Sequence, residues 1–164
     1  CAHRTDLEVI TSIHSHVAME VAMNSMVMDA VMEHTRVFVV LDQTLETSGY
    51  GLITAIVTDR QEAESYVSRK RLEASGSEQV WSVLEFPVRS LLELSASLSM
   101  LFVVYESELD GIRPVHLYAS ERLAQCKVSE LESFDQLRRL TDELSGQWSA
   151  PRSYWWECCP VIHG

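Results

Sequence analysis

Two continuous runs of apolar residues, 37–41 and 101–105, are the strongest hydrophobic pattern in this 164-residue chain. Both are rich in valine and aromatic residues and lack the polar alternation of a half-exposed strand. Such runs are typical of β-strands that are buried on both faces. Shorter apolar stretches at 52–57, 81–88, 115–119 and 154–161 predict four further strands.

These segments recur in the same order, which indicates an internal duplication. Val37-Phe38-Val39-Val40-Leu41-Asp42 returns as Leu101-Phe102-Val103-Val104-Tyr105-Glu106, and the last strand of each copy ends in Pro-Val. Each copy is predicted to be strand, strand, helix, strand. The pattern, over 37–88 and 101–161, resembles small ββαβ modules of bacterial and phage genomes, most of them of unknown function. That resemblance implies a fold and no particular activity.

A helix is predicted before the last strand of each copy. Thr58 and Ser120 are expected to be the N-cap residues, because each offers a side-chain oxygen to the first free amides. The second helix carries leucine and phenylalanine at three- and four-residue steps, which predicts one buried stripe. Its members are Leu131, Phe134, Leu137, Leu140 and Leu144.

The expected fold class is therefore α+β: two tandem ββαβ repeats with antiparallel sheets related by a pseudo-twofold axis, plus an N-terminal apolar helix. In each repeat the strand order is expected to be 2-1-3. The expected parts are a helical extension (1–36), the first repeat (37–88), a connector (89–100) and the second repeat (101–164). The pattern leaves open whether the repeats form one six-stranded sheet or two packed sheets.

Residues 5–34 form the predicted N-terminal helix, which is apolar on more than one face. A surface helix of a monomer normally has a single apolar stripe. The helix is thus predicted either to be buried against the repeats on both sides or to contact another chain with one face. The candidate interface residues are Val17, Met19, Val21, Met23, Met26 and Met28.

Composition narrows the function classes. The chain holds 24 acidic and 13 basic residues, a net charge of −11, which argues against direct nucleic-acid binding. No window approaches the ~18 apolar residues of a membrane span. The four cysteines, at 1, 126, 158 and 159, lack the spacing of a disulfide framework, so reduced thiols and a cytoplasmic location are expected.

Catalytic signatures are scarce in the sequence. We expect no metal site and no cofactor, because the histidine and cysteine clusters lack a complete ligand set and no glycine-rich phosphate loop is present. The best candidate for a binding cleft lies between the repeats, where the last strands place aromatic and acidic residues. These are Trp81, Glu85, Trp155, Trp156 and Glu157.

The sequence favours a non-enzymatic protein–protein interaction module, either a homo-oligomer or a subunit of a larger assembly. Two alternatives stay open. One is an acidic inhibitor, of the kind a phage encodes, that occupies a basic nucleic-acid-binding groove. The other is a small-molecule sensor or enzyme that uses the cleft between the repeats.

Overall fold

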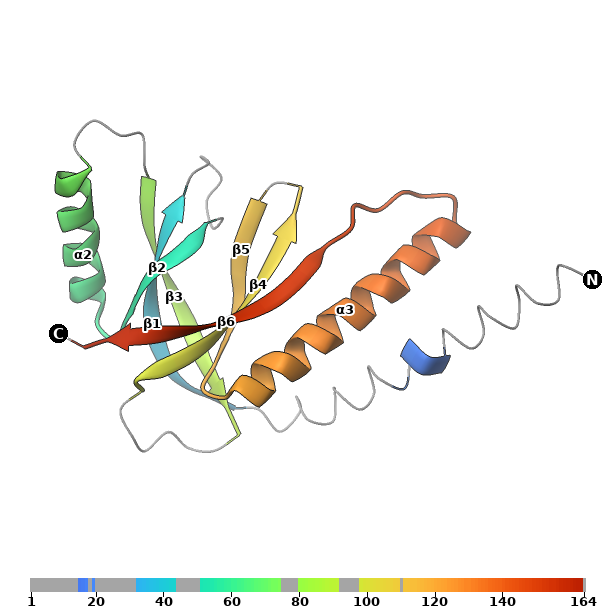
Figure 1. The fold of residues 1–164 in the computed structure, drawn as a ribbon, viewed down its shortest axis with the longest axis horizontal. Helices are drawn as coiled ribbons and strands as arrows, with labels where there is room; N and C mark the ends of the chain where they lie inside the picture. The colour runs from blue at the N-terminus through green and yellow to red at the C-terminus, as the bar shows by residue number, and fades with distance from the viewer. Residues whose placement is uncertain are drawn as a thin grey trace, which may run out of the picture.

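The computed structural model describes residues 15–17, 19, 32–43, 51–74, 80–91, 98–109 and 111–163. Its strands and main helices are β1 (Met32–Gln43), β2 (Leu52–Val57), α2 (Arg60–Glu73), β3 (Val80–Ser90), β4 (Met100–Glu108), β5 (Gly111–Tyr118), α3 (Glu121–Leu144) and β6 (Ser153–Ile162). The strands form a closed barrel in the order β1-β2-β6-β4-β5-β3. The helices α2 and α3 lie on opposite sides of this barrel (Figure 1).

The expected fold class, two tandem ββαβ repeats with antiparallel sheets, is wrong. β1 pairs antiparallel with β2 and β3, and β4 pairs antiparallel with β5 and β6. However, β2 also pairs in parallel with β6, and β3 pairs in parallel with β5. These two parallel contacts join strands far apart in the sequence and close the sheet on itself, which leaves neither an open sheet nor two separate ones.

The apolar runs of β1 and β4 are buried on both faces, as predicted. Alternate residues point into the barrel, where all six strands contribute to one core: Val37, Val39, Leu41, Ile56, Val88, Leu101, Val103, Tyr105, Leu117 and Val161. The other face of β1 packs under α2, through Val40 and its neighbours. The other face of β4 packs under α3, through Val104.

The helix ends differ in part from the prediction. The N-cap of α2 is Asp59 and not Thr58, and the Asp59 carboxylate accepts a hydrogen bond of 3.0 Å from the backbone N–H of Glu62. Ser120 is the N-cap of α3, as predicted, although its side chain makes no capping hydrogen bond. Aspartate is a somewhat better N-cap than threonine, so the residue preference agrees with Asp59 over the adjacent Thr58.

The predicted stripe on α3 is only partly buried. The buried residues of this helix lie between Leu123 and Asp135, whereas Phe134 and Leu144 are 46% and 72% exposed. The helix covers the barrel with its first part, and its last turns extend beyond that contact (Figure 1).

The pairing of β1 with β2 contains a β-bulge. Val40 pairs with Ala55 and Leu41 with Ile53, so Thr54 is an extra, unpaired residue of β2. A bulge of this kind bends the strand and redirects the side chain of the extra residue. The Thr54 hydroxyl donates a 3.2 Å hydrogen bond to the carbonyl oxygen of Val40.

The predicted helix at 5–34 is helical in part of its described residues and is replaced by a strand at its end. Residues 15–17 are helical, but β1 already begins at Met32, inside the segment predicted to be helical.

A search of the described helices finds none with the length and apolar character of a membrane span.

We predict that Gly51→Ala lowers the free energy of unfolding by at least about 2 kcal/mol. Gly51 has a φ of 144°, and a Cβ there would collide with the carbonyl oxygen of Asp42. Its N–H also donates a 2.6 Å hydrogen bond to the carbonyl oxygen of Ile112. Urea denaturation of the purified variant measures the loss.

Gly146→Ala is the matched control, because Gly146 has a positive φ of 72° with no atom within 4 Å of the added Cβ. It should lose only about 1 kcal/mol, the conformational cost of alanine in the left-handed region. Equal losses in the two variants would contradict the collision at Gly51.

Candidate functional site

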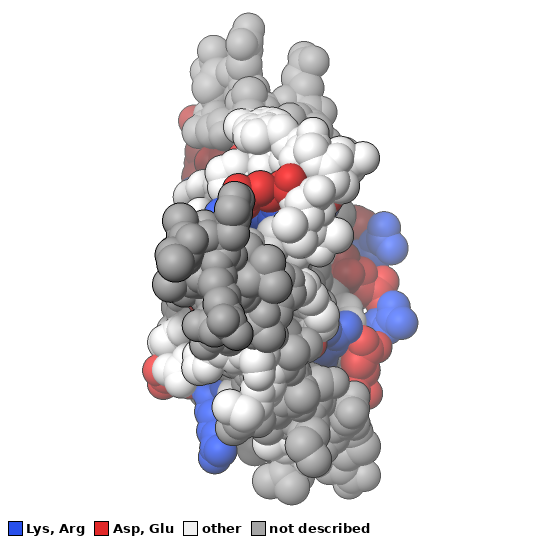
Figure 2. Space-filling view, turned by 90° about the vertical axis from the view of Figure 1, so that its right-hand side faces the viewer, with Lys and Arg blue, Asp and Glu red and all other residues white. Residues whose placement is uncertain are grey.

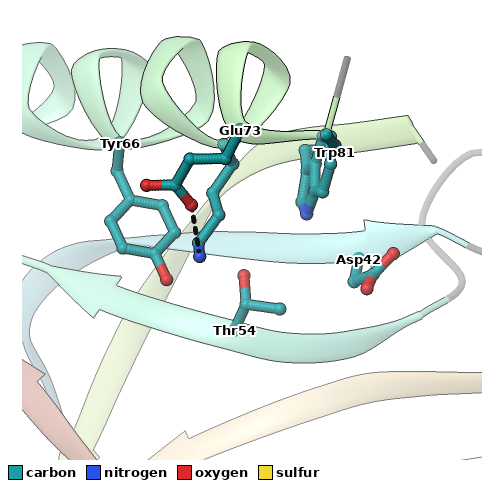
Figure 3. A pocket seen from close by; sticks show the side chains of 7 residues that line it. Asp42, Thr54, Tyr66, Glu73 and Trp81 are labelled. Atoms are coloured by element: carbon teal, nitrogen blue, oxygen red, sulfur yellow. Dashed lines mark hydrogen bonds and ion pairs between the residues drawn. The ribbon is translucent and has the colours of Figure 1, made fainter. Parts of the chain in front are cut away.

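The candidate site is a hollow of about 550 Å³ between α2 and the strands β1, β2 and β3. Figure 3 shows side chains of the helix and of the strands reaching into it from opposite sides. The described residues that line it are Asp42, Thr54, Tyr66, Lys70, Glu73, Ala74 and Trp81.

Asp42 is the distinctive residue of the hollow. It lies near the end of β1 and pairs with Leu52 of β2 and Trp81 of β3, so the three side chains share one face of the sheet. Its Oδ1 atom is buried, and no described residue hydrogen-bonds to it. Buried polar atoms are almost always hydrogen-bonded, so an unpartnered carboxylate oxygen at a hollow marks a place for a ligand.

The helix side of the hollow already contains an ion pair. Lys70 Nζ lies 2.9 Å from Glu73 Oε2, three residues further along α2. This hydrogen bond raises the pKa of Lys70 and lowers the pKa of Glu73. The Lys70 ammonium is therefore bound to Glu73, and it makes no ion pair with Asp42 among the described residues.

Aromatic rings form the apolar walls. Trp81 is 6% exposed and packs with Val40 and Val67 under α2. Tyr66 is half-buried, and Lys70 Nζ lies 5.9 Å from the centre of its ring. A carboxylate beside an aromatic ring, as Asp42 is beside Trp81 (Figure 3), favours organic cations, since the ring and the carboxylate both attract positive charge.

The described lining residues include neither histidine nor cysteine. They supply one unpaired carboxylate, one satisfied ion pair, two hydroxyls and an indole. This set can bind and orient a cation through charge, hydrogen bonds and ring contacts.

A second polar cluster lies on the α3 side of the barrel and is filled by the chain itself. Glu106 of β4 is 4% exposed and accepts two hydrogen bonds at Oε2 from Arg113, 2.9 Å from Nε and 2.6 Å from Nη2. Arg152 Nη1 lies 3.3 Å from the other oxygen, Oε1, and the Tyr154 hydroxyl donates to it at 3.3 Å. Arg152 also pairs with Glu108 at 2.6 Å. Glu106 is thus neutralised within the chain.

A third cluster surrounds His116 of β5. Arg89 Nη1 lies 2.7 Å from His116 Nδ1, so this nitrogen accepts a hydrogen bond from the guanidinium and the ring is neutral. Burial, together with the charges of Arg89 and Lys127, lowers the pKa of His116 to about 3. The other guanidinium nitrogen of Arg89, Nη2, pairs with Glu33 at 3.2 Å.

The predicted cleft residues occupy four different environments: the hollow, the exposed surface, the barrel core and the α3 side of the sheet. Only Trp81 lines the hollow. Glu85 is exposed and pairs with Arg36 at 2.8 Å. Trp155 stacks on Tyr105, with 5.4 Å between ring centres, and packs against the barrel core.

The remaining two lie on β6. Trp156 contacts Phe102 edge-on, with ring centres 5.8 Å apart, on the α3 side of the sheet. Glu157 is exposed and accepts a 3.2 Å hydrogen bond from Trp155 Nε1. Among the described lining of the Asp42 hollow, neither Trp156 nor Glu157 is present.

Of the predicted interface residues, the structure describes two. Val17 is 3% exposed and Met19 is 61% exposed. Val21, Met23, Met26 and Met28 lie outside the described residues. The N-terminal interface therefore stays a prediction.

The two adjacent cysteines near the C-terminus lie on β6 and differ in burial. Cys158 is exposed, whereas Cys159 is half-buried beside Tyr105, and neither forms a disulfide. Burial raises the pKa of the Cys159 thiol, which makes it less reactive than an ordinary cysteine.

Sequence reasoning missed Asp42, Thr54, Tyr66, Lys70 and Glu73 as site residues. A signal for three of them exists, because Tyr66, Lys70 and Glu73 are spaced i, i+4 and i+7 and so share one face of α2. Asp42 directly follows the apolar run 37–41, but its lack of a partner among the described residues depends on the residue that pairs beside it. Thr54 lines the hollow only because of the bulge.

Comparison with known protein families, curated proteins and solved structures gives no match.

We predict that Glu106→Gln lowers the free energy of unfolding by about 2 kcal/mol, because two guanidiniums lose their buried carboxylate. The Arg113 and Arg152 side chains are 38% and 37% exposed, so water screens part of the loss. Thermal denaturation measures it. Glu85→Gln is the control, since its ion pair with Arg36 is exposed and should contribute less than about 1 kcal/mol. A loss for E106Q as small as that for E85Q would contradict this structural role.

We predict that neutral His116 makes the protein acid-sensitive. Its pKa of about 3 lies below its ordinary value of 6.5, so the unfolded chain takes up the proton first as pH falls. The stability from neutral His116 is complete above about pH 6.5 and decreases toward pH 3; about 2 kcal/mol is lost by pH 5. Urea denaturation between pH 7 and pH 5 should show a steeper loss for the wild type than for H116Q.

The control for this titration is His163, which is exposed and hydrogen-bonded to the carbonyl oxygen of Leu98. H163Q should keep the wild-type pH dependence. Parallel profiles for the wild type and H116Q would show that His116 is not the group responsible.

Proposed function

We propose that this protein is a non-enzymatic protein-binding module and that the Asp42 hollow receives a cationic side chain of its partner. The observation that carries the proposal is the buried Oδ1 of Asp42, which has no hydrogen-bond partner among the described residues and lies in a hollow lined by Trp81 and Tyr66. Leaving such an oxygen without a hydrogen bond costs about 1–3 kcal/mol, which a bound cationic donor would recover.

A protein partner fits this hollow better than a free small molecule. Small-molecule sites bury most of the ligand surface. Here Thr54 is exposed and Glu73 is more than half exposed at its side chain, so the hollow is open to solvent. Leu52, paired beside Asp42, is 49% exposed and offers an apolar contact next to the charge. A side chain carried by a larger partner can enter the open hollow while the rest of the partner contacts Leu52.

The acidic-inhibitor alternative needs a continuous acidic surface. Among the described residues on the face in Figure 2, acidic and basic side chains lie next to one another. Several acidic residues are also engaged in ion pairs, such as Glu106 and Asp135 with arginines. The net charge of −11 instead supports attraction of a basic partner from a distance.

The function is tested with capped Gly/Ser pentapeptides that carry one central arginine, lysine or norleucine. Binding is followed by the indole N–H signal of Trp81 in NMR spectra, assigned with W81F. We expect saturable shifts with the cationic peptides and none with norleucine. D42N should weaken cation binding at least about tenfold, because one charged hydrogen bond is lost.

Glu132→Gln is the matched control, since it removes one exposed carboxylate from α3 and leaves the hollow intact. It should bind like the wild type. Absence of any Trp81 shift, or equal weakening by D42N and E132Q, would overturn the proposed site. If methylammonium or methylguanidinium binds as tightly as the peptides, the small-molecule alternative replaces a protein partner.

A further inference from the structure

The barrel contains a second position equivalent to that of Asp42. Asp42 is the second residue after the register shift between Val40 and Leu41, and Glu106 is the second residue after the shift between Val104 and Tyr105. Each acidic residue lies on a strand paired on both sides. The sheet therefore places two carboxylates in the same local setting, one under α2 and one under α3.

The neighbours of these two carboxylates correspond as well. Asp42 pairs with Leu52 across the bulged ladder, where Glu106 pairs with Arg113. On the other side, Asp42 pairs with Trp81, where Glu106 pairs with Tyr154. Where the first position has an apolar side chain and an indole, the second has a guanidinium and a phenol.

The consequence is that the chain itself fills the site at Glu106, whereas no described residue fills the site at Asp42. Two guanidiniums reach Glu106, with the closest contact 2.6 Å from Arg113 Nη2 to Oε2. Leu52 offers no donor to Asp42, whose Oδ1 is buried without a described partner. Asp42 lines the hollow and pairs directly with Leu52, so the two side chains lie on the same face of the sheet.

We infer that the cation received by the Asp42 hollow is a guanidinium, the arginine side chain of a partner, in the role that Arg113 plays at Glu106. The inference rests on the proposed function and adds the identity of the cation. Both groups that neutralise Glu106 within the chain are guanidiniums.

The walls of the hollow also favour arginine over lysine. A planar guanidinium stacks on aromatic rings and donates several hydrogen bonds in a fixed fork, whereas an ammonium is compact and strongly hydrated. Trp81 supplies an aromatic wall beside Asp42. The ammonium already present, that of Lys70, pairs with Glu73 on the helix side.

The experiment compares the arginine and lysine pentapeptides on the wild type by the same Trp81 signal. The arginine peptide should bind at least about tenfold more tightly. Equal affinities would overturn the inference and leave the proposed cation site standing. Binding of neither peptide would overturn both.

Leu52→Arg gives an independent arm, because it puts a guanidinium from the chain itself where Arg113 lies at the second position. Leu52 is 49% exposed, so the substitution needs no repacking of the core. L52R should bind the arginine peptide at least about tenfold more weakly and unfold at a higher temperature than the wild type. L52M should retain wild-type binding. Unchanged peptide binding by a folded L52R would overturn the equivalence of Leu52 and Arg113; if L52R does not fold, the peptide comparison on the wild type decides.

Discussion

Closure of the barrel is the constraint on which the rest of this structure depends. It is made by two short parallel contacts, Ile56–Val57 with Val161–Ile162 and Val88–Arg89 with Leu117–Tyr118. Two residue pairs per contact provide few hydrogen bonds, so the closed form is stabilised mainly by the apolar core that all six strands share. Once the barrel is closed, the outer faces of β1 and β4 point in different directions. Each of these faces is then covered by one helix.

This arrangement explains why the two acidic positions have different surroundings. Glu106 lies where β4, β5 and β6 meet, and arginines from β5 and from the segment before β6 reach it. Asp42 lies where β1, β2 and β3 meet, and the equivalent residue of β2 is Leu52. The backbone setting is shared, so the difference comes from the side chains. The fold provides the position of a carboxylate, and the neighbouring residue determines whether the chain satisfies it.

Much of the local structure could be predicted from sequence, because continuous apolar runs and helical spacing are local signals. The strands at 37–41 and 101–105 are buried on both faces, as their lack of polar alternation indicates. Closure could not be predicted, since a parallel contact of two residues leaves no pattern in either strand. The same holds for the site. Tyr66, Lys70 and Glu73 share a helical face that spacing reveals, but the bulge that places Thr54 in the hollow depends on register.

Asp42 Oδ1 has no hydrogen-bond partner among the described residues, and this follows from the neighbouring side chains and is not imposed by the barrel. The chain resolves the same problem at Glu106 with Arg113, which shows that this sheet accommodates a carboxylate paired to a guanidinium. Leu52 is half exposed, so nothing in the core packing requires an apolar residue there. A buried carboxylate oxygen without a donor reduces stability, and such local costs are typical of binding sites that are completed by a ligand. The contrast between the two positions therefore supports the proposal that the hollow at Asp42 is a binding site, since the carboxylate at the equivalent position, Glu106, is paired within the chain.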